Sequence, residues 1–263
     1  MHIETISSAV GEALGEPIPG ILLVGGMGTR LQSLLPHTPK PLAPVGENPF
    51  LEILVLQLRT WGVRRLVMCT GHRAEQIEET FGDGRKWDVN IEYSQELSPL
   101  GTAGALRFAK PLLQQVPDFL VLNGDSFLEL DFQQFLRFHR EHGGLVSMAV
   151  RKVQDASRYG TVDLDAKQRV VGFREKDNAG AAGLVNGGVY LFRRDALAHF
   201  PDGPASLEKD IFPRLLDHGV YAAEQYGMFI DIGTPEDYAR AQLLRQSLCQ
   251  AALSEKTTKG NPV

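Results

Sequence analysis

The sequence predicts an α/β fold of three layers, in which helices cover both faces of a mixed, mostly parallel central sheet. Short apolar runs alternate with segments of helical periodicity through the first half of the chain, the order typical of parallel β-α units. A glycine-rich loop directly follows the first apolar run. The chain has 263 residues, 43% of them hydrophobic and 22% charged, which is sufficient for a substantial core.

Each element of the first half is predicted from its apolar spacing and from glycines at its end. The segment 50–61, for example, places Leu51, Leu54 and Leu58 at helical spacing, and Gly62 ends it. Strands are expected at residues 21–26, 64–71, 89–96 and 118–127, and helices at residues 50–61, 74–84 and 101–113.

The second half is predicted to be mixed, and the chain to form one continuous domain. A final helix should be capped near Thr234, with Pro235 at its first position. Strands are expected at residues 145–153, 169–176 and 186–192, and a helix at residues 206–219. We expect an N-terminal appendage at residues 1–20, the domain at residues 21–250 and a polar tail at residues 251–263.

Charge and cysteine content exclude several classes of protein. The net charge of −5 and the pI of about 5.8 provide no general attraction to nucleic acid or to an anionic membrane. Cys69 and Cys249 form no CxxC motif, so neither a disulfide scaffold nor a zinc site is expected. Without a signal peptide or an apolar run of about 20 residues, the expected location is the cytoplasm. His139 and His142 are expected to be solvated on a polar helix.

The loop GGMGTRL after the first strand has the composition of a phosphate-binding segment. Its glycines allow a ligand to approach the backbone, whose N–H groups can bind an anion. Arg30 and Lys40 add cations suited to phosphate oxygens. The pattern is neither GxGxxG nor GxxxxGK[ST], so a dinucleotide fold and a P-loop are poor fits. A tight turn with solvated cations is the alternative interpretation.

Two aspartates stand at predicted strand ends far apart in the sequence. Asp125 ends the strand predicted at residues 118–127, and Asp231 follows a short apolar pair. In an open parallel sheet these ends border the crevice in which ligands bind. Two such carboxylates suit one Mg²⁺, although each could instead be a turn or helix-cap residue.

Several segments together resemble the sugar-1-phosphate nucleotidyltransferases, from about residue 21 to about residue 244. The N-terminal GGMGTRL followed by PKP carries the resemblance, and five further segments occur in order: LGTAGAL, NGDSF, REK, NGGVYLF and FIDIGTPEDY. The pair LGTAGAL and NGDSFLELDF is most similar to the D-glycero-D-manno-heptose 1-phosphate guanylyltransferases. The resemblance implies a Rossmann-like nucleotide-diphospho-sugar transferase fold.

The resemblance also implies a reaction and its participants. A nucleotidyl group would pass from an NTP, expected to be GTP, to a sugar 1-phosphate, expected to be the heptose, with release of pyrophosphate. Because the sugar phosphate is already anionic, no protein nucleophile is needed. The implied catalytic residues are Arg30, Lys40, Asp125 and Lys176. The implied metal ligands for Mg²⁺ are Asp125 and Asp231.

Substrate contacts follow from the same motifs. Glu175 and Lys176 resemble an E-K pair that many relatives follow with proline, whereas Asp177 follows here. The implied nucleotide-binding residues are Gly25, Gly26, Gly28, Thr29, Gln95, Gly101 and Thr102, although Gln95 could equally be a surface residue. The implied sugar-binding residues are Gly160, Glu175, Asn186 and Gly187.

Three alternatives remain open at this stage. The acceptor could be mannose 1-phosphate with GTP, or the enzyme could be a glucose 1-phosphate uridylyl- or thymidylyltransferase. A regulatory subunit that binds nucleotide sugars without catalysis is a third, although such a subunit should lack some of the charged residues present here. A homo-oligomer is also consistent with the resemblance.

Overall fold

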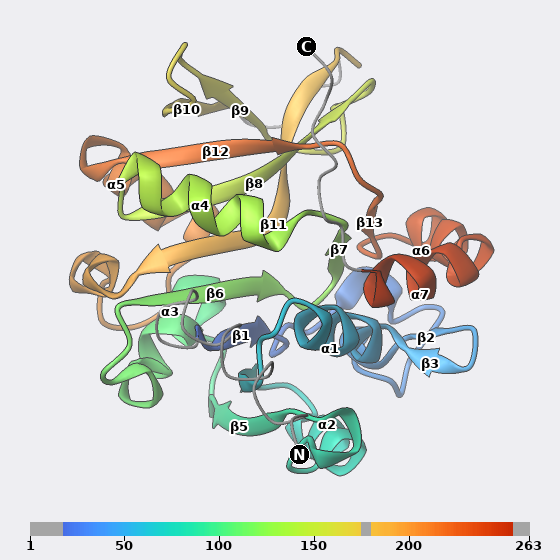
Figure 1. The fold of residues 1–263 in the computed structure, drawn as a ribbon. Helices are drawn as coiled ribbons and strands as arrows, with labels where there is room; N and C mark the ends of the chain where they lie inside the picture. Colours follow the sequence, from blue (N-terminus) through green and yellow to red (C-terminus); the bar gives the residue numbers. More distant parts are fainter. Residues whose placement is uncertain (1–17, 175–179, 255–263) are drawn as a thin grey trace, which may run out of the picture.

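The computed structural model describes residues 18–174 and 180–254 (Figure 1). A nine-stranded mixed sheet runs through them in the order β10-β9-β11-β6-β1-β4-β5, with β8 beside β11 and β12 beside β8. Its strands are β1 (Gly20–Leu23), β4 (Arg65–Thr70), β5 (Asn90–Gln95), β6 (Asp118–Asn123), β8 (Val146–Val153), β9 (Thr161–Leu164), β10 (Val170–Arg174), β11 (Gly183–Arg193) and β12 (Val220–Gln225).

The first half of the chain forms the parallel part of this sheet. β1 lies between β4 and β6 and is parallel to both, with Gly20 aligned with Leu66 on one side and Leu120 on the other. β5 continues the parallel series beside β4. Because these strands share one direction, their carboxyl ends reach the same edge of the sheet, where ligands bind in such folds.

The second half adds antiparallel strands around β11. β11 pairs antiparallel with β6, β8 and β9, and its register with β8 shifts between Asn186 and Val189. Only β12 restores a parallel pair there, with β8. The mixed α/β fold predicted from the sequence is therefore confirmed, with the parallel series ending at β6.

Strand alternation divides the core between the two faces of the sheet. Leu22 and Leu122 face one core, whereas Ile21 and Val121 face the other. The first core is covered by α1 (Phe50–Thr60), α2 (Ala74–Phe81), α4 (Phe132–His142), α6 (Pro235–Leu243) and α7 (Arg245–Leu253). The second is covered by α3 (Gly101–Phe108) and α5 (Phe212–Leu215), with short helical turns between them (Figure 1).

One predicted strand divides in two, and the division shapes the site. The segment expected at residues 118–127 ends as β6 at Asn123, and the chain leaves the sheet before β7 (Ser126–Leu128). β7 pairs with β13 (Phe229–Asp231) in a separate two-stranded sheet. Gly124 permits this exit, because a Cβ there would lie 2.7 Å from the Leu23 carbonyl oxygen. A second small sheet joins β2 (Pro44–Val45) and β3 (Asn48–Pro49).

Two helix predictions also differ from the structure. The helix expected at residues 206–219 consists of a π-helical turn (Leu207–Ile211), α5 and a 3₁₀ turn (Leu216–His218), with Pro213 in the first turn of α5. The final helix is broken at Leu244 into α6 and α7. α7 runs to Leu253, past the boundary expected at residue 250, because Leu248 and Ala252 pack in the same core as α1.

The ends of the chain complete the comparison with the sequence. β1 begins at Gly20, one residue before the expected start of the domain, and residues 1–17 and 255–263 lie outside the described structure. No helix in the described ranges has the length and apolar character needed to cross a membrane.

The burial predicted for Cys69 is confirmed. The prediction that His139 is solvated is wrong, because its side chain is only 1% exposed.

Candidate active site

The carboxyl ends of β1, β4 and β6 open into a cavity of about 510 Å³. Most of the residues predicted to bind nucleotide or act in catalysis line it. The predicted residues that line the cavity are Gly25, Gly26, Gly28, Thr29, Arg30, Lys40, Gly101, Thr102 and Asp125. The structure therefore brings together segments that are separated by up to about a hundred residues in the sequence.

The glycine loop forms one wall of the cavity beside Lys40. Gly28 has φ +58, and a Cβ at this position would lie 2.8 Å from the Cβ of Lys40. A glycine is therefore required both by the backbone conformation and by the close approach of Lys40. Arg30 is exposed on the 3₁₀ turn Thr29–Leu31, with its guanidinium available to a ligand.

Lys40 and Asp125 form an ion pair at the floor of this loop. The Lys40 Nζ donates to Asp125 Oδ2 at 2.5 Å. The lysine side chain is 13% exposed and the aspartate 37%, so the pair lies at the boundary of cavity and protein. Asp125 Oδ1 accepts a hydrogen bond of 3.2 Å from the Ser126 hydroxyl. The lysine thus presents a cation next to a carboxylate that still faces the cavity.

Asp231 lies beside Asp125 because β7 and β13 pair antiparallel. The register aligns Asp231 with Ser126, and the Ile232 N–H donates to the Asp125 carbonyl at 2.9 Å. Burial and the neighbouring Asp125 charge raise the pKa of Asp231 from 3.8 to about 6, against the opposing effects of Lys40 and the Gly233 N–H. The two carboxylates are therefore close enough to repel each other, an arrangement that a divalent cation would relieve.

The start of α3 forms the opposite wall. Gly101 has φ +71, and a Cβ there would lie 2.6 Å from the Ala205 carbonyl oxygen. The Thr102 hydroxyl accepts from the Leu207 N–H at 2.8 Å and donates to Glu208 at 3.3 Å. Thr102 therefore holds the segment after Ala205 at the cavity that it also lines.

Glu96 lines the cavity, whereas its neighbour Gln95 does not. Gln95 is exposed at the end of β5 and is absent from the lining of the cavity, so its place beside the nucleotide stays a prediction. Strand alternation turns Gln95 away, and the chain after β5 brings Glu96 into the lining. Glu96 Oε2 accepts the Leu100 N–H at 3.2 Å. Burial raises the pKa of Glu96, and this backbone hydrogen bond opposes the shift.

Three of the predicted sugar-binding residues, Gly160, Asn186 and Gly187, are not in the lining of this cavity. Asn186 donates to the Tyr190 hydroxyl at 2.6 Å, and Gly187 is buried at the register shift in β11, where a Cβ would lie 2.5 Å from Leu128. Gly160 is exposed, next to the Arg174 carbonyl. Their spacing in the sequence carries no information on which face of a strand or bulge they occupy.

Glu175 and Lys176 lie outside the described residues. Several lining residues were not predicted from the sequence. They include Met27, Glu96, Pro99, Asn123, Glu208 and Gly233. Asn123 is the first residue of the NGDSF motif, and Glu96 directly follows the predicted Gln95. Glu208 had no such signal, because it belongs to a segment predicted as an ordinary helix.

The sequence of residues 19–247 matches the Nucleotidyl transferase family. The chain belongs to this family. That membership identifies it as a nucleotidyltransferase enzyme, in agreement with the cavity described above.

Two curated relatives of this nucleotidyl transferase carry a more specific name. This chain is 35% identical over 250 residues to the mannose-1-phosphate guanylyltransferase catalytic subunit beta of Drosophila pseudoobscura pseudoobscura. The alignment covers 94% of this chain and 67% of the relative. The chain is 35% identical over 234 residues to the mannose-1-phosphate guanylyltransferase of Mycobacterium tuberculosis, covering 87% of this chain and 65% of the relative. The nucleotidyl transferase thus spans about two thirds of the length of these relatives.

Solved structures support the fold of this nucleotidyl transferase. HddC from Yersinia pseudotuberculosis, complexed with GMP-PN, has a TM-score of 0.77 and 30% identity, covering 86% of this chain and 98% of that one. A structure from Bacillus anthracis has a TM-score of 0.78 with 22% identity, covering 92% and 98%, and bears on the fold alone.

Proposed function

We propose that this nucleotidyl transferase moves the GMP group of GTP to a sugar 1-phosphate, with mannose 1-phosphate as its acceptor and pyrophosphate as the second product. In this reaction a phosphate oxygen of the sugar 1-phosphate bonds to the α-phosphorus of GTP while the bond to the leaving pyrophosphate breaks. The main support for this proposal is that the glycine loop, Lys40, Asp125 and Glu96 line one cavity.

Glu96 supports guanine as the base. The Watson–Crick edge of guanine presents two neighbouring donors, N1–H and the exocyclic amine, and a carboxylate is the side chain that can accept both. The Leu100 N–H fixes Oε2 of Glu96 from the start of the helix that walls the cavity. Adenine offers a ring acceptor at the corresponding position, which an ionised carboxylate would repel.

The cations of the glycine loop support the placement of the triphosphate. Arg30 is exposed at the cavity and the Lys40 ammonium lies beside Asp125, so both can neutralise phosphate oxygens while the leaving pyrophosphate gains charge. Backbone N–H groups of the loop offer further donors, and Gly26 leaves room for a ligand because nothing lies within 4 Å of the position a Cβ would take there. The protein contributes positioning and charge, and needs no nucleophile of its own.

Asp125 and Asp231 would hold the Mg²⁺ that this reaction class uses. Their donor atoms are the hard oxygens that Mg²⁺ prefers. Burial raises the pKa of Asp231, and the neighbouring Asp125 charge raises it further, so a cation here would have two carboxylates to neutralise. Bound there, Mg²⁺ would supply charge neutralisation of the triphosphate. Lys40 provides a fixed cation at the same place, and its contact with Asp125 holds that carboxylate in position.

Mannose 1-phosphate is favoured as the acceptor by the names of the curated relatives, in place of the heptose expected from the sequence. Heptose 1-phosphate remains the second candidate, because the LGTAGAL and NGDSFLELDF segments are most similar to the heptose 1-phosphate guanylyltransferases. One or two hydrogen bonds in the sugar pocket, worth about 1–3 kcal/mol when left unpaired, are sufficient to decide between them.

A matrix of five NTPs against several sugar 1-phosphates, read as pyrophosphate release with Mg²⁺, tests the proposal. GTP with mannose 1-phosphate should give the highest kcat/KM. Comparable rates with GTP, ATP, UTP, CTP and dTTP would contradict the guanine assignment. A higher rate with heptose 1-phosphate than with mannose 1-phosphate would identify the heptose as the acceptor. Nucleotide binding without turnover of any pair would indicate a regulatory subunit.

A further inference from the structure

We propose that the edge of the sheet opposite the catalytic cavity carries a second binding site, for a small molecule that joins a phosphate group to an apolar body. The site surrounds the beginning of β6. Asp118 starts this strand and aligns with Arg193 of β11, whereas Asn123 at its other end lines the catalytic cavity. At about 3.3 Å per residue, the two ends of β6 lie about 17 Å apart, so the sites are distinct.

A cavity of about 430 Å³ opens at this edge between α4, β6 and the end of β11. Its charged lining contains more cations than acids. The residues are Arg140, Arg193 and Arg194, with His139, Asp118 and Asp195. In the part of the chain that the structure describes, no side-chain hydrogen bond or ion pair engages any of the three arginines.

Unpaired arginines around one hollow favour an anion. A guanidinium presents several N–H donors in a planar fork that matches phosphate oxygens. His139 lowers the pKa of Asp118 most, against the opposing effect of burial, and the Arg193 and Arg140 charges lower it further. The field at this edge is therefore positive even with Asp118 ionised.

His139 supplies an independent indication of a ligand. Its side chain is 1% exposed, and its Nδ1 lies 2.8 Å from the Ser147 hydroxyl. Among the described residues its Nε2 has no hydrogen-bond partner, and the closest acidic oxygen, on Asp118, is 3.8 Å away. In the tautomer in which the Ser147 hydroxyl donates to Nδ1, the proton is on Nε2, on the side of Asp118. A phosphate oxygen would satisfy this buried donor.

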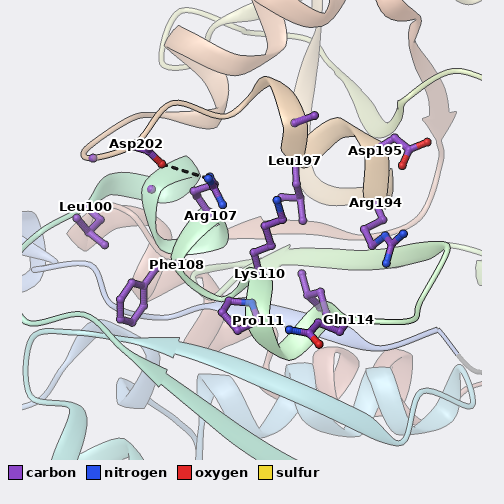
Figure 2. Close-up of a pocket in the computed structure, with 14 residues that line it drawn as sticks. Leu100, Arg107, Phe108, Lys110, Pro111, Gln114, Arg194, Asp195, Leu197 and Asp202 are labelled. Atoms are coloured by element: carbon purple, nitrogen blue, oxygen red, sulfur yellow. Dashed lines mark hydrogen bonds and ion pairs between the residues drawn. The ribbon is translucent and has the colours of Figure 1, made fainter.

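The apolar part of the proposed ligand is indicated by a larger hollow that adjoins the first. This second cavity, of about 810 Å³, shares Arg194 and Asp195 with the arginine-lined one. Figure 2 places Leu197 and Lys110 between Arg194 on one side and Phe108 on the other. The Phe108 side chain is 53% exposed, although it is a large aromatic group. A ligand that spans both cavities would cover this ring while its phosphate contacts the arginines.

Phenyl phosphate is a suitable probe, because it combines one phosphate with one aromatic ring. Calorimetric titration of the full protein should detect binding about 10-fold tighter than that of inorganic phosphate, and phenol alone should bind more weakly than either. Arg140→Ala and Arg194→Ala should each weaken the binding of phenyl phosphate by about 10-fold. Both side chains are exposed, so their removal should leave the fold unchanged.

Two control variants make the test specific. Arg137→Ala removes an exposed arginine of α4 that does not line either cavity, and should bind phenyl phosphate like the natural protein. Lys40→Ala changes the catalytic cavity and should also leave this binding unaltered. Equal affinities for all the arginine variants, or a loss confined to Lys40→Ala, would overturn the proposal. So would phenyl phosphate that binds no tighter than inorganic phosphate, because the apolar cavity would then contribute nothing. The readout is binding alone, so it is independent of the proposed guanylyl transfer.

Discussion

The Lys40 ammonium lies 2.5 Å from the Asp125 carboxylate, although 85 positions separate the two residues in the sequence. The contact links the loop that follows β1 to the point where the chain leaves the sheet after β6. It thereby places a fixed cation against one of the two acids proposed to hold Mg²⁺. The predictions below begin from this pair.

Replacing Lys40 should impair chemistry more than folding. Lys40→Ala removes a charge that would stabilise the leaving pyrophosphate, so kcat should fall by about 100- to 1000-fold. Thermal unfolding should change little, because the lysine lies at the edge of the cavity. Lys167→Ala, which removes an exposed lysine in the turn between β9 and β10, is the matched control. Near-normal turnover of Lys40→Ala would contradict a catalytic role for Lys40.

The raised pKa of Asp231 predicts a specific dependence of stability on pH. The folded-state pKa of about 6 exceeds the ordinary value of 3.8, so this group stabilises the fold at low pH and loses that contribution as pH rises through about 6. Asp231→Asn should therefore become more stable relative to the natural protein between about pH 4 and pH 8, by about 2 kcal/mol.

Urea unfolding of both proteins at the two pH values, without divalent cations, measures this difference. Mg²⁺ at the higher pH should stabilise the natural protein and should have a weaker effect on Asp231→Asn. A stability difference between the two proteins that does not change with pH would contradict the raised pKa. An equal effect of Mg²⁺ on both would contradict the assignment of Asp231 as a ligand.

Gly28 should be intolerant of a side chain for two separable reasons. Its φ of +58 strains any other residue, and a Cβ would lie 2.8 Å from the Cβ of Lys40. Gly28→Ala should therefore lower kcat by displacing Lys40, in addition to a stability loss of about 1 kcal/mol or more. Gly62→Ala provides the comparison, since Gly62 has φ +81 but nothing within 4 Å of its Cβ position. If both variants lose stability and neither loses turnover, the contact with Lys40 has no catalytic consequence.

Glu96 should determine the preference for guanine. Glu96→Gln leaves one acceptor oxygen and adds an amide N–H₂ that opposes a guanine donor, so the ratio of kcat/KM for GTP over ATP should fall by about 10- to 100-fold. Steady-state kinetics with both nucleotides gives this ratio. Gln95→Ala should leave it unchanged, because Gln95 is exposed outside the cavity. An unchanged ratio in Glu96→Gln would place base recognition elsewhere.

Much of this protein could be predicted from local sequence patterns. Apolar runs such as that of β1, and the helical spacing of α1, identified the elements because each forms mainly through its own periodicity. The glycine loop, Lys40 and Asp125 were identified as a group by residue type and by resemblance, and the structure brings them into one cavity. Each of these features depends on a few adjacent residues, so motifs that occur in a known order are sufficient to identify them.

Other features were decided only when distant segments met. Asp231 acquires its raised pKa because β13 pairs with β7 and buries it beside Asp125. Glu96 and not Gln95 lines the cavity, because the direction of a side chain at a strand end depends on the path of the chain beyond it. His139 is buried through the packing of α4 on the sheet, although its helix is polar in sequence. The sequence by itself therefore determined the fold class and the chemical groups of the site. The tertiary structure decided which of those groups face one another, because burial and mutual distance are properties of packed elements and not of any one segment.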